Sequence, residues 1–198
     1  MELFFDVETT GLPARGATCF DLDAYSDARI VSIAWVLRSK LQVMSQQYCV
    51  VRQEETNSDS DPLGASFIHG INRSMTQTFG KELSCVLKDF VSDVALSETV
   101  VAHNLEFDSN VVGSELYRLG LDPSTFLKHK SHCTMKSNTD LVKKTFENSR
   151  SYKWPKLSEL YHFCFHRDMK GAHNALADVE NTADCYYFVR DNIVDLTT

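Results

Sequence analysis

The chain lacks any apolar run long enough to cross a membrane. A spanning helix needs roughly 18 consecutive apolar residues, and no stretch of the 198 residues approaches that length. The first residues also lack the basic and apolar regions of a secretory signal peptide and are typical of a strand. We therefore expect a soluble, cytoplasmic protein with no membrane partner.

Cysteine pairs with metal-binding or redox spacing are also missing. None of the six cysteines stands in a Cys-x-x-Cys pattern, and a chain of this length does not need disulfides, so we expect reduced thiols. The segment His162-Phe163-Cys164-Phe165-His166 has the residue types of a zinc site but no second ligand pair at finger spacing. Cys164 falls in helical register with apolar neighbours, which favours a core position.

No segment has the composition of a linker between domains. With 43% hydrophobic residues, the chain can bury one substantial core. The one polar, weakly hydrophobic stretch covers residues 54–61, and we expect it to be a loop that joins a strand to the next helix. The economical prediction is a single domain over residues 1–198.

Positive charge is scarce overall but concentrated in one segment. The formal net charge of −7 argues against a polyanionic partner. Between residues 118 and 156, however, nine Lys or Arg stand against three acids, a local balance of +6. Interleaved aromatic residues favour a track for single-stranded nucleic acid, although a solvated lysine-rich helix with core aromatics has the same composition. These aromatic residues are Phe126, Phe146, Tyr152 and Trp154.

Two carboxylates stand two residues apart near the start of the chain. Leu3 to Val7 is a short apolar run interrupted only by Asp6, and turn residues follow Glu8. Side chains at i and i+2 of a strand leave the same face, so Asp6 and Glu8 are expected to project side by side. Such a pair suits a hard cation that prefers oxygen ligands, but it is also common at a solvated strand end.

Three further candidates lie at the beginnings of predicted helices. Asp108 falls in the first turn of a helical pattern over residues 107–119. Asp178 lies within a second pattern over residues 174–191, and His173 directly precedes it. Each has an ordinary structural explanation, because acidic and polar residues are common at helix N-termini. If the fold brings these acids together with the first pair, divalent cations are needed to neutralise their repulsion.

The order and framing of these segments resemble the three motifs of the DnaQ-like, DEDDh class of 3′-to-5′ exonucleases, within the ribonuclease H-like superfamily. Three motifs in this order are far less expected by chance than any one of them. Ala175 stands where a related subclass has tyrosine, which favours the histidine subclass. The motifs are Asp6-x-Glu8-Thr-Thr-Gly-Leu, His103-Asn104-x-x-Phe107-Asp108 and His173-x4-Asp178.

The resemblance implies a two-metal site and a substrate-binding surface. Asp6, Glu8, Asp108 and Asp178 would hold two divalent cations, Mg²⁺ or Mn²⁺, with Asp6 shared between them. His173 would take the proton from the attacking water. The residues expected to contact the nucleic acid are Thr9, Leu12, His69, Ile71, His103 and Asn104.

The implied activity is metal-dependent hydrolysis that releases nucleoside 5′-monophosphates from the 3′ end of DNA, single-stranded or frayed, in repair or proofreading. RNA or short oligoribonucleotides are the first alternative, because both nucleic acids offer the same phosphodiester and differ at the 2′-OH. A non-catalytic nucleic-acid-binding or polymerase-docking module is the second, but such a relative normally lacks a ligand, and all five positions are filled. A polymerase partner has no support in the sequence, and a homodimer stays open.

The predicted fold is α/β, a mixed sheet of five strands flanked by helices, as the ribonuclease H-like resemblance implies. Residues 30–37 and 41–51 are expected to form a hairpin. Residues 11–30 exceed a minimal family loop and are expected to be an insertion at the rim of the active site. The other predicted elements are strands at 99–102 and 131–134 and helices at 62–68, 80–95, 107–119, 135–147, 156–164 and 174–191.

Overall fold

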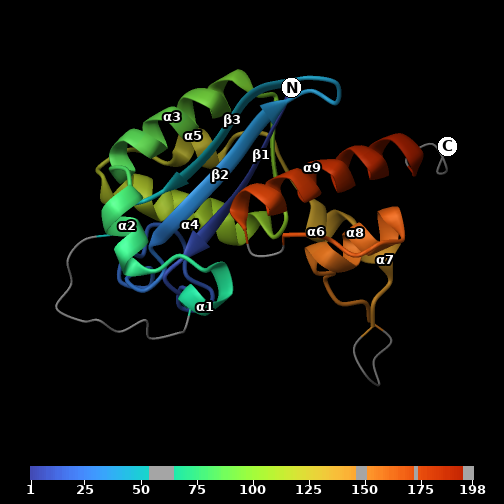
Figure 1. Cartoon of the computed structure of the whole chain (residues 1–198), viewed down its shortest axis with the longest axis horizontal. Coiled ribbons are helices and arrows are strands. Elements are labelled where there is room, and N and C mark those ends of the chain that lie inside the picture. Colours follow the sequence, from blue (N-terminus) through green and yellow to red (C-terminus); the bar gives the residue numbers. More distant parts are fainter. Residues whose placement is uncertain (54–64, 146–150, 172–173, 194–198) are drawn as a thin grey trace.

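The computed structural model describes residues 1–53, 65–145, 151–171 and 174–193. Its centre is one mixed sheet of five strands, as predicted (Figure 1). The strands are β1 (Glu2–Thr9), β2 (Ile30–Arg38), β3 (Val43–Val50), β4 (Thr99–Ala102) and β5 (Ser131–Cys133). Their order is β3-β2-β1-β4-β5, with β2 antiparallel to both neighbours and β1, β4 and β5 parallel.

Helices cover both faces of this sheet (Figure 1). They are α1 (Ala65–His69), α2 (Arg73–Phe79), α3 (Leu83–Leu96), α4 (Leu105–Arg118), α5 (Ser124–Leu127), α6 (Thr134–Ser137), α7 (Thr139–Val142), α8 (Leu157–Phe165) and α9 (Ala175–Asn192). The larger hydrophobic core joins α3 and α4 to one face, and a smaller core joins α9 to the other. Helix α8 packs against the far side of α9.

The alternation of side chains along β1 decides where the acids go. Leu3, Phe5 and Val7 enter the larger core, whereas Phe4 packs in the smaller core beneath α9. Because side chains of a strand alternate between its faces, Asp6 and Glu8 leave on the same side as Phe4. The predicted strand and its face are therefore both in place, and α9 is the helix that this face meets.

Residues 11–30, the predicted insertion, pack along α4. Cys19 is buried, and its backbone N–H donates to Oδ1 of Asn110 at 3.2 Å. The Phe20 ring lies edge-on to Tyr117, with centroids 5.3 Å apart. Cys19 also sits so close to Gly113 that a Cβ there would come within 3.0 Å of it. The segment therefore contributes to the core that supports α4.

One predicted helix was wrong. Residues 135–147 do not form a continuous helix, because the described part breaks into the short helices α6 and α7. The Asn138 side-chain amide donates to the carbonyl of Thr134 at 2.7 Å, a local bond that competes with helix continuation. Lys143 then adopts a left-handed conformation, and Thr145 bridges to Tyr152 in antiparallel fashion.

The other predictions agree within a few residues, with two omissions. Helices α2 and α5 were not predicted, since each is short and has a weak apolar pattern. The loop expected at 54–61 lies outside the described residues, as do residues 62–64 of one predicted helix. Among the described residues, no helix is long and apolar enough to span a membrane. All six cysteines are free thiols.

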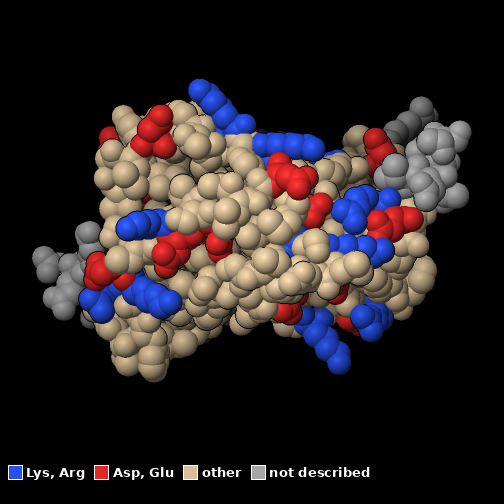
Figure 2. Space-filling model, turned by 90° about the horizontal axis from the view of Figure 1, so that it is seen from above, with Lys and Arg blue, Asp and Glu red and all other residues tan. Residues whose placement is uncertain are grey.

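Figure 2 views the molecule from above Figure 1, the side on which the turn between β2 and β3 lies. Basic and acidic side chains are interspersed over this face, and both signs occur next to one another. A polyanion gains little from such a surface, because each attractive contact is accompanied by a repulsive one.

Candidate active site

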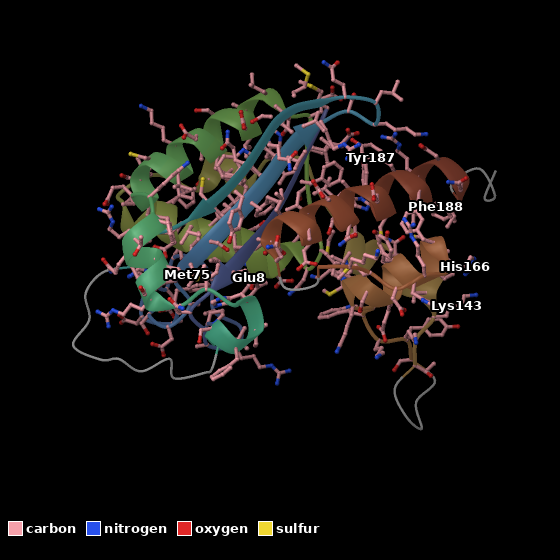
Figure 3. The ribbon with its side chains drawn as sticks, in the orientation of Figure 1. Glu8, Met75, Lys143, His166, Tyr187 and Phe188 are labelled. Atoms are coloured by element: carbon pink, nitrogen blue, oxygen red, sulfur yellow. The ribbon has the colours of Figure 1, made fainter. Side chains whose placement is uncertain are left out.

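Three carboxylates converge at the end of β1. Asp6 and Glu8 come from the strand, and Asp178 comes from the first turn of α9. Each offers a carboxylate oxygen, and the three oxygens lie within 4.8 Å of one another. Among the described residues, no other group of three His, Cys, Asp or Glu side chains lies this close. Figure 3 shows Glu8 at this end of β1, with α1 on one side and the group α6 to α8 on the other.

The N-terminus of α9 is built to hold Asp178 in place. Asn174 precedes the helix in an extended conformation, and its side-chain oxygen accepts from the backbone N–H of Ala177 at 3.2 Å. This is an N-cap, which satisfies one of the free N–H groups of the first turn. Asp178 therefore projects from a fixed helix end toward β1.

Asp108 approaches the cluster from α4. It is buried, and its Oδ1 accepts a hydrogen bond from the backbone N–H of Val7 at 3.2 Å. Strand β4 pairs with β1 only as far as Phe4, so it provides no acceptor for Val7. Asp108 takes that place, and its carboxylate thereby contacts the residue between Asp6 and Glu8.

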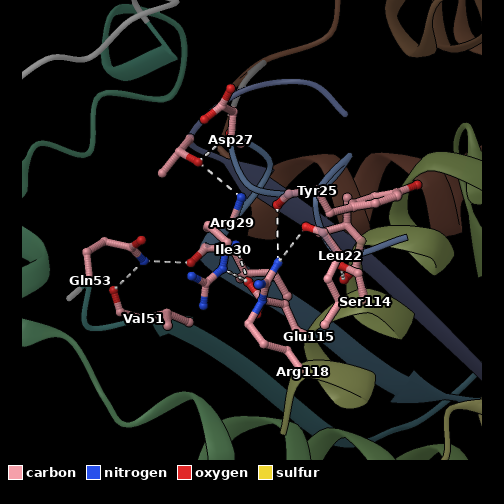
Figure 4. A network of polar contacts seen from close by, with 12 residues as sticks. Leu22, Tyr25, Asp27, Arg29, Ile30, Val51, Gln53, Ser114, Glu115 and Arg118 are labelled. Carbon is pink, nitrogen blue, oxygen red and sulfur yellow. Dashed lines mark hydrogen bonds and ion pairs between the residues drawn. The ribbon is translucent and has the colours of Figure 1, made fainter. Parts of the chain in front are cut away.

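A buried ion-pair network holds the far end of α4 (Figure 4). Glu115 is 1% exposed and pairs with Arg29 at 2.7 Å and with Arg118 at 3.5 Å. Arg118 also donates to the carbonyls of Leu22 and Tyr25, at 3.5 and 3.4 Å. Since removing one partner of a buried pair leaves an uncompensated charge, this network ties residues 11–30 and the start of β2 to the helix that carries Asp108.

The cluster is strongly perturbed electrostatically. Burial, followed by the charges of Asp108, Glu8 and Asp178, raises the pKa of Asp6 well above its ordinary value. Burial and then the Asp178 charge raise the pKa of Glu8 to about 7. Burial raises the pKa of Asp108 to about 8 against the opposing hydrogen bond from Val7. Carboxylates this close retain protons unless cations replace them, so the site offers oxygen donors that lose their protons when divalent cations bind.

His173, the predicted general base, lies outside the described residues. The next residue, Asn174, is described, and it caps the helix that carries Asp178. The role of His173 therefore stays a proposal that rests on the third sequence motif.

Both ring nitrogens of His103, a predicted substrate-binding residue, have partners within the protein. Its Nε2 lies 3.0 Å from the carbonyl of Pro155, which can only accept, so Nε2 carries the hydrogen. Its Nδ1 then accepts from the hydroxyl of Thr134, also at 3.0 Å. Burial lowers the pKa of His103 to about 4, although the Pro155 bond acts in the opposite direction. We interpret His103 as a neutral anchor for residues 134–155, because both ring nitrogens are already occupied.

Asn104, next to His103, remains a candidate for contact with the nucleic acid, as predicted. It adopts the left-handed conformation, with φ at 68°, which asparagine tolerates better than most residues. Its side chain makes no capping bond to α4, although it occupies the N-cap position. The side-chain amide thus remains a candidate for contact with a nucleic-acid backbone.

The turn after β1 contributes one rigid and one exposed residue. The hydroxyl of Thr9 donates to the carbonyl of Gly11 at 2.7 Å, and Thr9 is nearly buried. Thr9 therefore shapes the turn. Leu12, a predicted substrate-binding residue, is 70% exposed, so its side chain is accessible.

The turn after α1 departs from the prediction in part. Nδ1 of His69 accepts from the backbone N–H of Ile71 at 3.1 Å, and Gly70 between them has φ at 73°, a conformation that favours glycine. Ile71 is only 6% exposed, so its side chain stabilises the turn instead of offering a surface. Phe67 and Ile68 of α1 are strongly exposed and apolar, and they were not predicted as part of this surface.

The aromatic residues of the basic segment divide into two kinds. Phe126 is buried in the larger core against Phe5 and Phe90, so it cannot stack on a base. Phe146 lies outside the described residues. Tyr152 and Trp154 are exposed. The predicted aromatic and basic track is therefore limited to the residues after α6, which include the exposed Tyr152 and Trp154.

Solved structures with the same fold come from exonuclease I of E. coli. Its complex with a dT13 oligonucleotide matches with a TM-score of 0.75 and 18% identity, covering 99% of this chain and 42% of that one. Its complex with a dA16 oligonucleotide gives 0.71 and 19%, covering 98% and 41%. The zinc-bound complex with single-stranded DNA gives 0.72 and 19%, covering 99% and 41%. The chain thus spans about two fifths of the length of these proteins, and the likeness shows the fold.

Sequence comparison gives the family. No protein of curated function matches the chain. The pattern of the RNase_T exonuclease family, in contrast, matches residues 3–186, which include all three predicted motifs. The resemblance to the DnaQ-like exonucleases is therefore confirmed, and the prediction of a metal-dependent exonuclease is confirmed at the level of the family. The chain belongs to the exonuclease family.

Proposed function

We propose that the chain is a single exonuclease domain that hydrolyses nucleic acid from the 3′ end and releases nucleoside 5′-monophosphates. The proposed substrate is DNA with a single-stranded or frayed 3′ end, and the proposed role is DNA repair or proofreading. The observation that carries the proposal is the convergence of Asp6, Glu8 and Asp178, whose oxygens lie within 4.8 Å of one another.

Asp6, Glu8, Asp108 and Asp178 would hold two divalent cations, Mg²⁺ or Mn²⁺. The donor set supports this, because it consists of carboxylates whose pKa values are raised by burial and by one another. Bound cations of this kind stabilise the charge that develops on the attacking and leaving oxygens of a phosphodiester. Asp108 has a second task, since its bond to Val7 fixes the first motif relative to the second.

The remaining residues of the site would position the substrate and move the proton. His173 would accept the proton from the attacking water, a task suited to an imidazole whose ordinary pKa is about 6.5. Leu12, in the turn four residues after Glu8, and the exposed residues of α1 would contact the terminal nucleotide. Asn104 would hold the nucleic-acid backbone.

DNA is favoured as substrate by two considerations. The Thr-Thr-Gly-Leu frame after Glu8 is closest to the DnaQ type, and structures of similar fold were solved with dA16 and dT13 oligonucleotides. Labelled single-stranded DNA, duplex DNA and RNA of one sequence, offered side by side with Mg²⁺, test the proposal. We expect 5′-monophosphates to appear fastest from single-stranded DNA. Faster release from RNA would show that RNA is the preferred substrate. Internal cleavage would overturn the exonuclease reaction.

A further inference from the structure

The fold leaves the indole of Trp154 in solvent. Trp154 is 60% exposed, whereas the other tryptophan of the chain, Trp35, is 1% exposed and donates from Nε1 to Asp93. Large aromatic residues are usually buried, because each removes a large apolar surface from water. An exposed indole is therefore a candidate binding surface.

Trp154 is linked to Asp108 through a series of connected residues. Pro155, the next residue, accepts through its carbonyl from His103 at 3.0 Å. His103 adjoins Asn104, the N-cap of α4, and Asp108 stands in the first turn of that helix. One hydrogen bond and one helical turn thus connect the backbone beside the indole to a proposed metal ligand.

The indole is held in place from several directions. The Nζ of Lys136 lies 5.5 Å from the ring centroid, in cation–π contact, and also pairs with Glu106 of α4. The preceding segment is fixed by the bridge between Tyr152 and Thr145. An exposed aromatic group that is already ordered loses little entropy when a ligand stacks on it. Because Trp154 remains 60% exposed, Lys136 does not cover the whole indole.

The surroundings of Trp154 are basic. Five lysines stand within residues 136–156, and Asp140 is the only acid among the described residues of that range. Glu159, in α8, pairs with Lys144 and Lys153, at 3.8 and 3.3 Å. Among the described residues, the remaining lysines Lys143 and Lys156 form no ion pair. This leaves positive charge for a phosphate backbone next to an exposed aromatic face.

We infer that Trp154 is the stacking platform for an unpaired base of single-stranded nucleic acid that enters the site, with Lys136 holding the indole and the neighbouring lysines contacting the backbone. A π-face and a basic groove are the two components by which proteins bind single strands without regard to sequence. The inference rests on the proposed function and adds a binding residue to it. It requires an unpaired base, so a blunt duplex cannot use this platform.

Tryptophan fluorescence tests the inference without hydrolysis. In EDTA, a long oligothymidylate is titrated into the protein, and Trp35 supplies a constant buried emission. We expect the emission of Trp154 to be quenched by the single strand and not by a blunt duplex of the same length. The Trp154→Phe variant should show no quenching while it retains affinity, because phenylalanine also stacks.

Affinity provides the second readout. Trp154→Ala should bind the oligothymidylate roughly 5- to 150-fold more weakly, the range expected for the loss of one stacked base. Tyr48→Ala, which removes another exposed aromatic residue on the edge strand β3, is the matched control and should bind like the wild type. Its thermal midpoint and that of Trp154→Ala should both stay near that of the wild type.

The outcomes separate this inference from the proposed function. Oligonucleotide degradation in Mg²⁺ without quenching, and with unchanged affinity of Trp154→Ala, would overturn the platform and leave the nuclease. Quenching and weakened binding in a protein that degrades nothing would support the platform and overturn the nuclease. Equal quenching by single strand and duplex would also overturn the inference, because paired bases cannot stack on the indole.

Discussion

The carboxylate of Asp108 accepts a hydrogen bond from the backbone N–H of Val7, the residue between Asp6 and Glu8, at 3.2 Å. The second motif is thereby attached to the first by a single bond across 101 residues of sequence. The bond exists because β4 pairs with β1 no further than Phe4, which leaves this part of β1 without a neighbour on that side. Asp108 is thus both a proposed metal ligand and a substitute for a missing strand partner.

This double task predicts different stabilities for two substitutions at Asp108. Asp108→Asn keeps an oxygen acceptor for Val7 and cannot ionise, whereas Asp108→Ala leaves a buried N–H without a partner. The unfolding free energy from urea titration, in EDTA, should be lower for the alanine variant by about 1–3 kcal/mol, the cost of an unsatisfied buried donor. Both variants should lose turnover. Equal stabilities would show that the bond to Val7 contributes nothing.

The acid cluster predicts how the metal-free protein responds to pH. The pKa values of Glu8 and Asp108 are raised to about 7 and about 8, so the folded protein binds more protons than the unfolded one. The stability that protonation confers is complete below their ordinary values near 4 and is lost as pH rises through about 7 and 8. The thermal midpoint in EDTA should therefore fall between about pH 6.5 and 8.

The titration of His103 does not change the expected fall in the thermal midpoint between about pH 6.5 and 8. Its pKa is lowered to about 4, so its own effect is a loss of stability as pH falls below about 6.5. Saturating Mg²⁺ should raise the midpoint more at pH 8 than at pH 6.5, because cations bind deprotonated carboxylates. Asp6→Asn is the control and should show a shallower slope in EDTA. A wild-type midpoint that is flat or rises over this window would contradict the electrostatic account of the site.

Substitution of His173 separates a base from a ligand. His173→Ala should remove most of the turnover while Mg²⁺ or Mn²⁺ binding, followed by calorimetry, persists. Asp178→Asn should weaken metal binding, since its carboxylate oxygen lies within 4.8 Å of those of Asp6 and Glu8. If His173→Ala lost metal affinity as severely as Asp178→Asn, His173 would have to be reassigned as a ligand.

The basic segment predicts a dependence on substrate length. Lys143 and Lys144 are both exposed, and changing them together to Glu should raise KM for long single strands while barely affecting a dinucleotide. The salt dependence of long-strand binding should flatten by about 0.7 in slope for each phosphate that the variant no longer binds. A matched change of Lys88, an exposed lysine of α3, should have no effect. An unchanged KM and slope in the double variant would show that the segment is only a solvated surface.

The positions of the acids were predictable because the sequence pattern that places each of them on its strand or helix is local. Period-two alternation in β1 placed Asp6 and Glu8 on one face, and the helical patterns around Asp108 and Asp178 gave their positions in first turns. The motif order then supplied the assembly that no local pattern contains. The apolar patterns also predicted the bounds of strand β4 and helix α9 to within one residue.

The errors arose where a tertiary contact decides the conformation. The bond of His103 to Pro155 joins residues 52 apart, so the sequence did not reveal that this histidine anchors a distant segment. Burial of Phe126 against Phe5 depends equally on distant packing. The side chain of Asn138 bonds back to Thr134 and interrupts a stretch of otherwise helical composition. Residue type alone does not reveal any of these partners.

The most direct measurement follows a 5′-labelled single-stranded DNA during digestion, in Mg²⁺ and in EDTA, with wild type, Asp6→Asn and Asp178→Asn. We predict a ladder that shortens from the 3′ end only with wild type in Mg²⁺, with both variants folded and nearly inactive. Variants that remain folded are expected, because removing mutually repelling acids does not weaken the metal-free protein. Full turnover in EDTA, or undiminished turnover by both variants, would contradict the proposed two-metal site.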